Sequence, residues 1–248
     1  MVYGSSALLA HEIWAQPLGI GTNNAVFVED CVFTKTAFGN AIDAEYGGKY
    51  VFRHNILNDV YIEAHSIQGN DRAARSWEIY DNAFNQSKQS IYVPIRLRGG
   101  TGVVFNNTFT GTFDLLAIGL DNVRSCTTEA VSGLCDGSSV WDGNQAGQAG
   151  YPCRDQIGRS TDSWLWTASN PYPPQQLDPA YEWNNYRGST QVNFASIQCA
   201  QSQGHIQENR DFYNGTAKPG YTPYIYPHPL AVVEKGGVGP ARNLRIER

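Results

Sequence analysis

The sequence predicts an all-β protein whose chain winds into a right-handed parallel β-helix, a solenoid of short strands. Two observations predict this fold: a repeat of about 25 residues, and short strands at constant offsets within each repeat. The composition agrees, because the 248 residues include 25 Gly, 12 Pro and 14 Tyr but only one Met. No segment keeps the i, i+3, i+4, i+7 pattern of an amphipathic helix for three turns, so we expect few and short helices.

A column of polar residues in the repeat marks a sharp corner of the chain. The segments VFVEDCVF, YVFRHNIL, WEIYDNAF and VVFNNTF, which begin at residues 26, 50, 77 and 103, align to place in one column Cys31, Asn55, Asn82 and Asn107. Asn185 in YEWNNY extends the column after a long insertion. The preceding residue is always Asp, His or Asn, and these types readily accept a left-handed backbone. Stacked Asn amides at such a corner can join successive coils by hydrogen bonds.

A second strand follows each corner at a similar offset. The segments AIDAE (41–45), YIEAH (61–65), PIRLR (94–98) and AIGLD (117–121) align and give two apolar columns. One column contains Ile42, Ile62, Ile95 and Ile118, and the other contains Ala44, Ala64, Leu97 and Leu120. Because side chains alternate between the two faces of a strand, these columns point inward and the residues between them point outward.

The repeats divide the chain into segments. We expect β-helix coils over residues 23–122, an irregular disulfide-containing insertion over 123–180, a last coil with an extended C-terminal segment over 181–230, and a tail over 231–248. Residues 1–22 are expected to form either a cap or a truncated coil, because the open end of a solenoid needs a cover. If this end is not capped, self-association through it is expected.

The cysteines favour disulfides and export. None of the five belongs to a CxxC pair or has the spacing of a zinc site. Four lie in a stretch rich in Gly, Ser and Asp: Cys126, Cys135, Cys153 and Cys199. Disulfides would stabilise such a stretch most, which favours a secreted or periplasmic protein, although the first 14 residues lack the features of a signal peptide. Cys31 falls in a predicted strand, where we expect a buried free thiol.

Charge and hydropathy argue against two classes of partner. The net charge is −5 and there is no basic run, so the electrostatic footprint of a nucleic-acid-binding protein is missing. No stretch of about 18 consecutive apolar residues is present to form a membrane-spanning helix. We therefore expect neither nucleic acid nor a membrane as the partner.

The corner motifs carry a resemblance to a known family. VFRHN, WEIYDNAF and TGVVFNNTF resemble the asparagine-ladder corners of the pectate-lyase-like superfamily of right-handed β-helix proteins, over residues 23–122. In that superfamily the first sheet lines the carbohydrate cleft. The resemblance implies that the strands at 41–45, 61–65, 94–98 and 117–121 form the cleft wall, and that the partner is a polysaccharide.

The outward residues of these four strands concentrate charge. One column contains Asp43, Glu63, Arg96 and Gly119, and the other contains Glu45, His65, Arg98 and Asp121. Adjacent coils stack at about 4.8 Å, so seven ionisable groups should share one patch and perturb one another's pKa values. The alternative is a salt-bridged surface without a ligand, because acid and Arg side chains often pair across neighbouring strands.

One chemistry that suits the patch is β-elimination by a polysaccharide lyase on a uronate-containing chain. The arrangement is similar to the chondroitinase-B and alginate-lyase branch of the superfamily. Arginine would neutralise the uronate carboxylate, and His65 would remove the adjacent carbon-bound proton. The expected catalytic residues are His65, Arg96, Arg98 and Glu63, and the expected substrate-binding residues are Asp43, Glu45, Lys49 and Asp121. As hard oxygen ligands for Ca²⁺ we expect Asp43, Glu45 and Glu63.

Two other functions suit the same residues. A glycoside hydrolase would use two carboxylates, about 5–5.5 Å apart in a retaining enzyme and about 6.5–9.5 Å apart in an inverting one. Asp43 with Glu63 fits the shorter separation, and Asp43 with Glu45 fits the longer one. A non-catalytic β-helix for polysaccharide binding or surface adhesion would use the patch only to hold its ligand.

Overall fold

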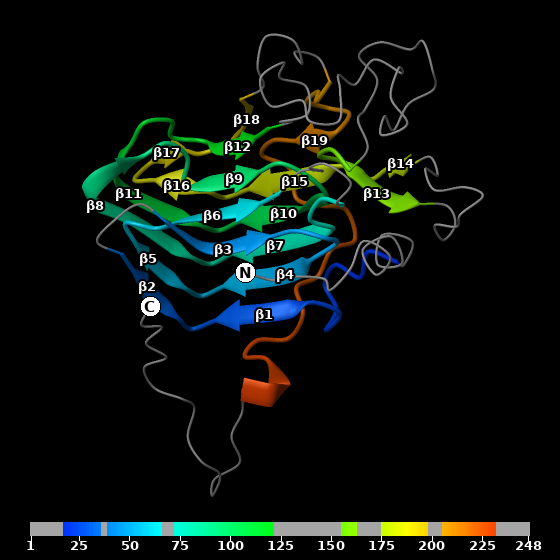
Figure 1. Ribbon diagram of the computed structural model, residues 1–248, viewed down its shortest axis with the longest axis horizontal. Helices are drawn as coiled ribbons and strands as arrows, with labels where there is room; N and C mark the ends of the chain where they lie inside the picture. Colours follow the sequence, from blue (N-terminus) through cyan, green and yellow to red (C-terminus); the bar gives the residue numbers. More distant parts are fainter. Residues whose placement is uncertain are drawn as a thin grey trace, which may run out of the picture.

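The computed structural model describes residues 17–35, 39–65, 72–121, 155–162, 175–197 and 205–231. Within these residues the protein is all-β, as predicted, with three mainly parallel sheets and one small antiparallel pair (Figure 1). The helical structure described is the short 3-10 helix η3 (Pro229–Ala231). No helix in this part of the chain is long and apolar enough to cross a membrane.

Each large sheet is named here after its first strand. The β1 sheet contains β1 (Val26–Glu29), β4 (Lys49–Arg53), β7 (Ser76–Tyr80), β10 (Thr101–Phe105), β15 (Ala180–Trp183) and β19 (Phe212–Tyr213). The β2 sheet contains β2 (Val32–Thr34), β5 (Ile56–Asn58), β8 (Ala83–Ile91), β11 (Thr108–Phe113), β16 (Tyr186–Arg187) and β17 (Thr190–Gln191). The β3 sheet contains β3 (Asn40–Ala44), β6 (Tyr61–Ala64), β9 (Ile95–Leu97), β12 (Ile118–Leu120) and β18 (Phe194–Ser196).

The chain visits the three sheets in turn. We call three consecutive strands, one from each sheet, a circuit: β1 to β3 form the first and β4 to β6 the second. Each strand of the first circuit pairs in parallel with its counterpart in the second. The predicted register of the β3 sheet is confirmed, since Cα partners run along the column Ile42, Ile62, Ile95 and Ile118.

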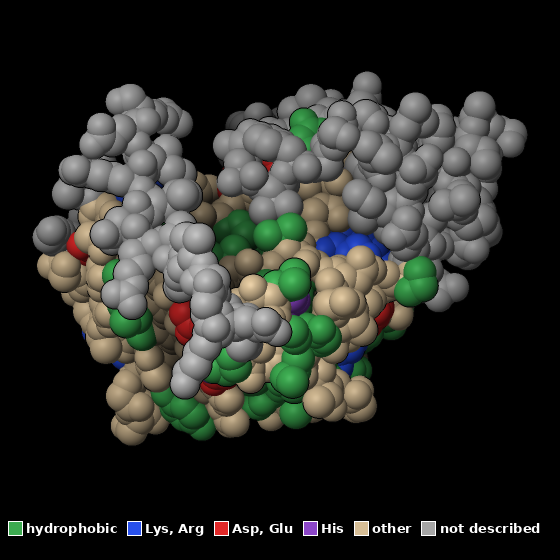
Figure 2. Space-filling model, turned by 90° about the horizontal axis from the view of Figure 1, so that it is seen from below, with side chains coloured by type: hydrophobic (Ala, Val, Ile, Leu, Met, Phe, Trp, Pro, Cys, Tyr) green, Lys and Arg blue, Asp and Glu red, His purple; other side chains and the backbone are tan. Residues whose placement is uncertain are grey.

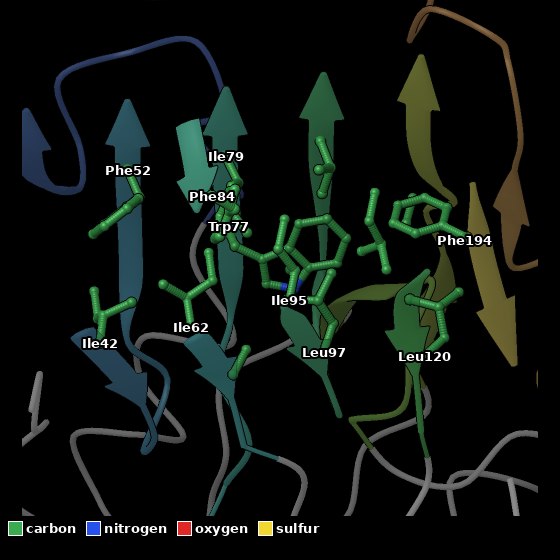
Figure 3. Packing of buried hydrophobic residues seen from close by; sticks show 14 of the residues in the cluster. Ile42, Phe52, Ile62, Trp77, Ile79, Phe84, Ile95, Leu97, Leu120 and Phe194 are labelled. Atoms are coloured by element: carbon green, nitrogen blue, oxygen red, sulfur yellow. The ribbon is translucent and has the colours of Figure 1, made fainter. Parts of the chain in front are cut away.

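The inward columns fill the interior with apolar side chains. Figure 3 shows residues of the β3 sheet, such as Ile42 and Ile62, together with Phe52 and Ile79 of the β1 sheet. Identical or similar residues lie above one another, as in the stacked rings of Phe84 and Phe109, whose centroids are 5.0 Å apart. Each large side chain that is fully buried in this way contributes about 1.5–3 kcal/mol to folding.

The predicted asparagine column forms a continuous hydrogen-bonded ladder. Each side chain donates through Nδ2 to Oδ1 of the next asparagine, at 3.1, 3.0 and 2.9 Å along the series Asn55, Asn82, Asn107 and Asn185. Each Oδ1 also accepts the backbone N–H of the column residue one circuit earlier. The last amide donates to the carboxylate of Glu182 at 3.0 Å. The ladder therefore fixes the register of five successive corners.

The residue before each ladder position has a left-handed backbone, as the sequence predicts. The φ angles are 57° at Asp30 and 55° at His54, Asp81, Asn106 and Asn184. Asp, Asn and His accept this conformation more readily than other residues with a side chain. The sharp turn lets the chain pass from the β1 sheet to the β2 sheet in one step.

Cys31 occupies the first position of the ladder but is not buried. It lies between β1 and β2 as a free, exposed thiol, so the prediction of a buried thiol in a strand is wrong. The physical reason is that β1, β2 and β3 are all edge strands of their sheets. At this end Val26 is 46% exposed and Val32 is 66% exposed, and Figure 2, seen from below Figure 1, shows hydrophobic side chains on the surface. The other four cysteines lie outside the described residues.

A C-terminal strap, residues 218–231, runs down the stack from the level of β19 to beyond β1 (Figure 1). It crosses the outer face of the β1 sheet, where Arg53 donates to the carbonyl oxygens of Tyr224 and Ile225 at 2.6 and 2.9 Å. The hydroxyl of Tyr221 donates to Glu78 at 2.6 Å. On the other side of Glu78, the backbone N–H of Gly21 donates to the same carboxylate at 3.0 Å.

The segment predicted as an irregular insertion contains regular structure in its described part. Strands β13 (Arg159–Asp162) and β14 (Gln175–Leu177) form an antiparallel pair. Buried ion pairs join this segment to the rest of the protein: Arg72 Nε lies 2.7 Å from Asp155 Oδ2, and Arg159 Nη2 lies 2.9 Å from Asp211 Oδ1. Charge-assisted hydrogen bonds thus attach this segment to Arg72, which precedes it in the chain, and to Asp211, which follows it.

Replacing one rung of the ladder should destabilise the fold strongly. Asn82→Ala removes four hydrogen bonds and leaves the buried N–H of Asn55 without an acceptor. We expect the free energy of unfolding to fall by about 2–4 kcal/mol in urea titrations. Asn58→Ala is the matched control, because Asn58 makes similar bonds on the outer face, and it should lower stability by less than about 1 kcal/mol. Equal losses in the two variants would contradict the structural role of the ladder.

Glu78 should make stability depend on pH. Burial raises the pKa of its carboxyl above the ordinary value of 4.5, although the hydrogen bonds from Tyr221 and Gly21 lower it. A raised folded-state pKa means that the folded protein binds this proton more tightly than the unfolded chain does. The resulting stabilisation is complete below pH 4.5 and is lost as pH rises through the folded-state pKa. Glu78→Gln should therefore be more stable than the wild type at pH 7 and equal to it at low pH, in denaturation curves measured across this range. Glu208→Gln, at an exposed position, is the control. Its difference in stability from the wild type should be the same at pH 7 and at low pH.

Candidate functional site

The outward residues of the β3 sheet stand side by side as the sequence predicts. Asp43 of β3, Glu63 of β6 and Arg96 of β9 are successive Cα partners, and Gly119 of β12 follows. The second column lies just past the strand ends, where backbone hydrogen bonds of 2.8–2.9 Å continue the pairing at His65, Arg98 and Asp121. We call the following residues the charged cluster: Asp43, Glu45, Glu63, His65, Arg96, Arg98 and Asp121.

His65 is the centre of the charged cluster. Its Nε2 lies 3.2 Å from Oδ2 of Asp43, and its Nδ1 lies 3.3 Å from Oε1 of Glu45. The guanidinium Nη2 of Arg98 also contacts Nε2 of His65. Because a guanidinium has only donors, this contact is a hydrogen bond only in the tautomer that carries its proton on Nδ1, facing Glu45.

Arg98 connects the histidine to a second carboxylate. Its Nε lies 2.8 Å from Oε1 of Glu63, while Nη1 of Arg96 lies 3.7 Å from the same oxygen. Arg96 in turn donates through Nη2 to Oδ2 of Asp121 at 2.6 Å. The cluster is therefore one connected network across four strands, in which every guanidinium has a carboxylate partner.

The cluster is more enclosed than an open cleft wall. The side chains of Glu63 and Arg98 are only 8% and 10% exposed, whereas that of Arg96 is 32% exposed. Tyr61 lies two residues before Glu63 on the same face, and burial together with the Glu63 and Asp43 carboxylates raises the pKa of its phenol. Arg96 is thus the cation of the cluster that solvent or a ligand reaches most readily.

The structure differs from the predicted site at Lys49 and Tyr50. Lys49, an expected substrate-binding residue, lies on β4 of the β1 sheet, and its ammonium donates to the carbonyl oxygen of Pro17 at 3.4 Å, so it does not join the charged cluster. Tyr50 follows it and was not predicted. Burial raises the pKa of the Tyr50 hydroxyl, and the Asp43 and Glu63 carboxylates add to the effect. No sequence pattern could reveal this, because Tyr50 belongs to an inward column of another sheet.

Asp43, Glu63 and His65 offer potential metal ligands. One atom from each lies within 4.8 Å of the other two, and Oδ1 of Asp43 is buried without a hydrogen bond to any described residue. The grouping differs from the expected trio, because Glu45 lies against the other nitrogen of His65. Two carboxylates provide the hard oxygen atoms that Ca²⁺ prefers, while an imidazole nitrogen suits transition metals better.

Comparisons with models of protein families, with curated proteins and with solved structures gave no match. The class of protein is therefore defined by the fold and the charged cluster alone: an all-β protein of stacked circuits with an acid, base and guanidinium network on one sheet.

The ion pair of Arg98 and Glu63 should be strongly coupled. Arg98→Ala leaves the Glu63 carboxylate buried without its closest cation, and we expect a loss of about 3 kcal/mol in stability. Adding Glu63→Ala should recover part of the loss, with a coupling energy of about 1–3 kcal/mol from a double-mutant cycle in urea. Additive effects of the two substitutions would show that the pair does not interact in solution.

Proposed function

We propose that this protein is a right-handed parallel β-helix of the pectate-lyase-like type that acts on a polysaccharide. Support for the fold comes from the cycle of the chain through three sheets and from the asparagine ladder at one corner. Support for the ligand class comes from the resemblance of the corner motifs, which assigns the β3 sheet to a carbohydrate cleft. The charged cluster lies on that sheet.

The activity that the cluster supports best is β-elimination on a uronate-containing chain. The observation that carries this proposal is the setting of His65, whose ring meets a carboxylate at each nitrogen and a guanidinium at Nε2. A histidine that donates from Nδ1 to an acid is a suitable general base at Nε2. Guanidinium groups beside it suit a substrate that carries a carboxylate.

The residues would act in the following order. The uronate carboxylate binds Arg96, the more exposed guanidinium, and draws Arg98 away from the imidazole of His65. The freed Nε2 of His65 accepts the proton from the carbon beside the carboxylate, and Glu45 stabilises the imidazolium that forms. The electron pair of that C–H bond forms a double bond to the neighbouring carbon as the bond from that carbon to the glycosidic oxygen breaks. The oxygen leaves with the electron pair of the broken bond and takes up a proton from water. Arg96 stabilises the negative charge that develops on the carboxylate.

A divalent cation fits this proposal on grounds of charge. Four carboxylates face two guanidinium groups in the cluster, which leaves two negative charges in excess when His65 is neutral. The free Oδ1 of Asp43 and the adjacent Glu63 carboxylate are the oxygen atoms that would hold Ca²⁺. A bound Ca²⁺ would supply positive charge for the uronate carboxylate. Glu45 would then contact His65 and would not be a ligand of the cation.

One observation favours glycoside hydrolysis as the second candidate. Carboxylate oxygens of Asp43 and Glu63 approach within 4.8 Å of each other, close to the separation of about 5–5.5 Å in retaining glycosidases. In that case Glu63, which is paired with Arg98, would be the nucleophile, and Asp43 would be the acid.

A panel of acidic and neutral polysaccharides, with Ca²⁺ or with EDTA, tests the proposal. We expect unsaturated products from a uronate polymer, and a loss of at least about a hundredfold in rate for His65→Ala and Arg96→Ala. Asn58→Ala, outside the cluster, should keep the wild-type rate. Reducing ends without unsaturation would establish hydrolysis instead, and retention of a polymer without any product would establish a binding protein.

A further inference from the structure

A groove runs over the corner between the β1 and β2 sheets, away from the charged cluster on the β3 sheet. It has a volume of about 360 Å³ and crosses three successive circuits. The asparagine ladder forms its floor, with Asn55 and Asn82 at the bottom. Because their amides are occupied by the ladder, the floor provides a fixed shape and no free hydrogen-bonding groups.

Two ridges of different chemistry border this corner groove. The polar ridge consists of the left-handed corner residues, with His54, Asp81 and Asn106 lining the groove. The apolar ridge begins the β2 sheet with Ile56, Ala83 and Thr108, which are in register. This row is open to solvent: Ile56 is 43% exposed. The residues that continue the row beyond the groove are Val32, the partner of Ile56, and Tyr186, the partner of Thr108, and they are 66% and 39% exposed.

The spacing of the ridges suits a linear ligand that lies along the stack. Each circuit adds one polar and one apolar position about 4.8 Å further on, which is on the scale of a single sugar ring. Tyr226 of the strap extends the polar ridge, because its ring packs against His54 at a tilt of 31° with centroids 3.7 Å apart. Its hydroxyl donates to Asp30 at 2.6 Å. An aromatic ring beside hydrogen-bonding groups is a suitable surface for a sugar, which has apolar C–H faces and polar edges.

The charges of the polar ridge select against anions. Asp30 and Asp81 are carboxylates, and the only basic group among the lining residues is His54, whose Nε2 lies 3.7 Å from Asp81. A uronate polymer would meet like charge here, whereas hydroxyl groups can donate to the carboxylate and amide oxygens. We infer that the corner groove is a second, non-catalytic binding site for a neutral glycan chain. This inference does not rest on the proposed activity of the charged cluster.

Affinity electrophoresis of the full chain tests this inference, with soluble galactomannan and xyloglucan as neutral probes and polygalacturonate as the anionic one. Ala83→Trp fills the groove from an outward position and should weaken retention by the neutral glycan at least about tenfold. Thr110→Trp places the same bulk on the same face outside the groove and should change retention by less than about twofold. Neither variant touches the charged cluster, so cleavage of a uronate polymer should be unchanged.

Ile56→Ser provides a second test that adds no bulk. It shortens the apolar ridge at an exposed position and should weaken neutral-glycan retention about threefold, with the melting temperature measured alongside. The inference is overturned if neither neutral glycan retards the wild type, if the anionic polymer retards it more strongly, or if Ala83→Trp and Ile56→Ser are retained like the wild type. Equal weakening by Thr110→Trp would overturn it as well, because the whole β2 sheet would then be the binding surface.

Discussion

The structure depends above all on the vertical register that the asparagine ladder imposes. Strand side chains alternate between the two faces, so a slip of one residue would exchange the apolar column of Ile62 with the charged column of Glu63. The buried amides resist such a slip, because each has one specific acceptor in the next circuit. Both the charged cluster and the corner groove require residues about 25 positions apart to stand side by side. The charged cluster and the corner groove therefore both depend on the register that the ladder imposes.

The charged cluster is a preformed network, which shapes how any ligand can bind. Arg98 already bridges Glu63 and His65, and Arg96 already bonds Asp121. An anionic ligand therefore exchanges one carboxylate for another at a guanidinium, and its net gain is smaller than that of a new ion pair in an apolar site. The same exchange alters the surroundings of His65.

Much of the fold and the composition of the site followed from local rules. The corner at Asn82 and the row from Asp43 to Arg96 required only residue types, alternation and a constant spacing. Side-chain contacts do not follow from such rules, because the placement of Arg98 against His65 depends on rotamers. The electrostatic effect of Asp43 and Glu63 on the Tyr50 hydroxyl depends on a strand of another sheet. The strap was predicted as an extended surface segment, but its partner Arg53 lies 171 residues before Tyr224. The exposure of Cys31 depends on its place in an edge circuit, which its own neighbours in the sequence do not reveal.

The ladder also has a direction. Every asparagine amide donates toward the later circuit and accepts from the earlier one, so their dipoles are aligned and reinforce one another along the stack. Such a row carries partial positive charge at its donor end, as the N-terminus of an α-helix does. Glu182 is the group at that end, fully buried and bonded to Asn185. Besides this terminal amide, its carboxyl group accepts the backbone N–H of Gly215 at 2.8 Å. These two donors at the positive end of the row accommodate an acid in the interior of the stack.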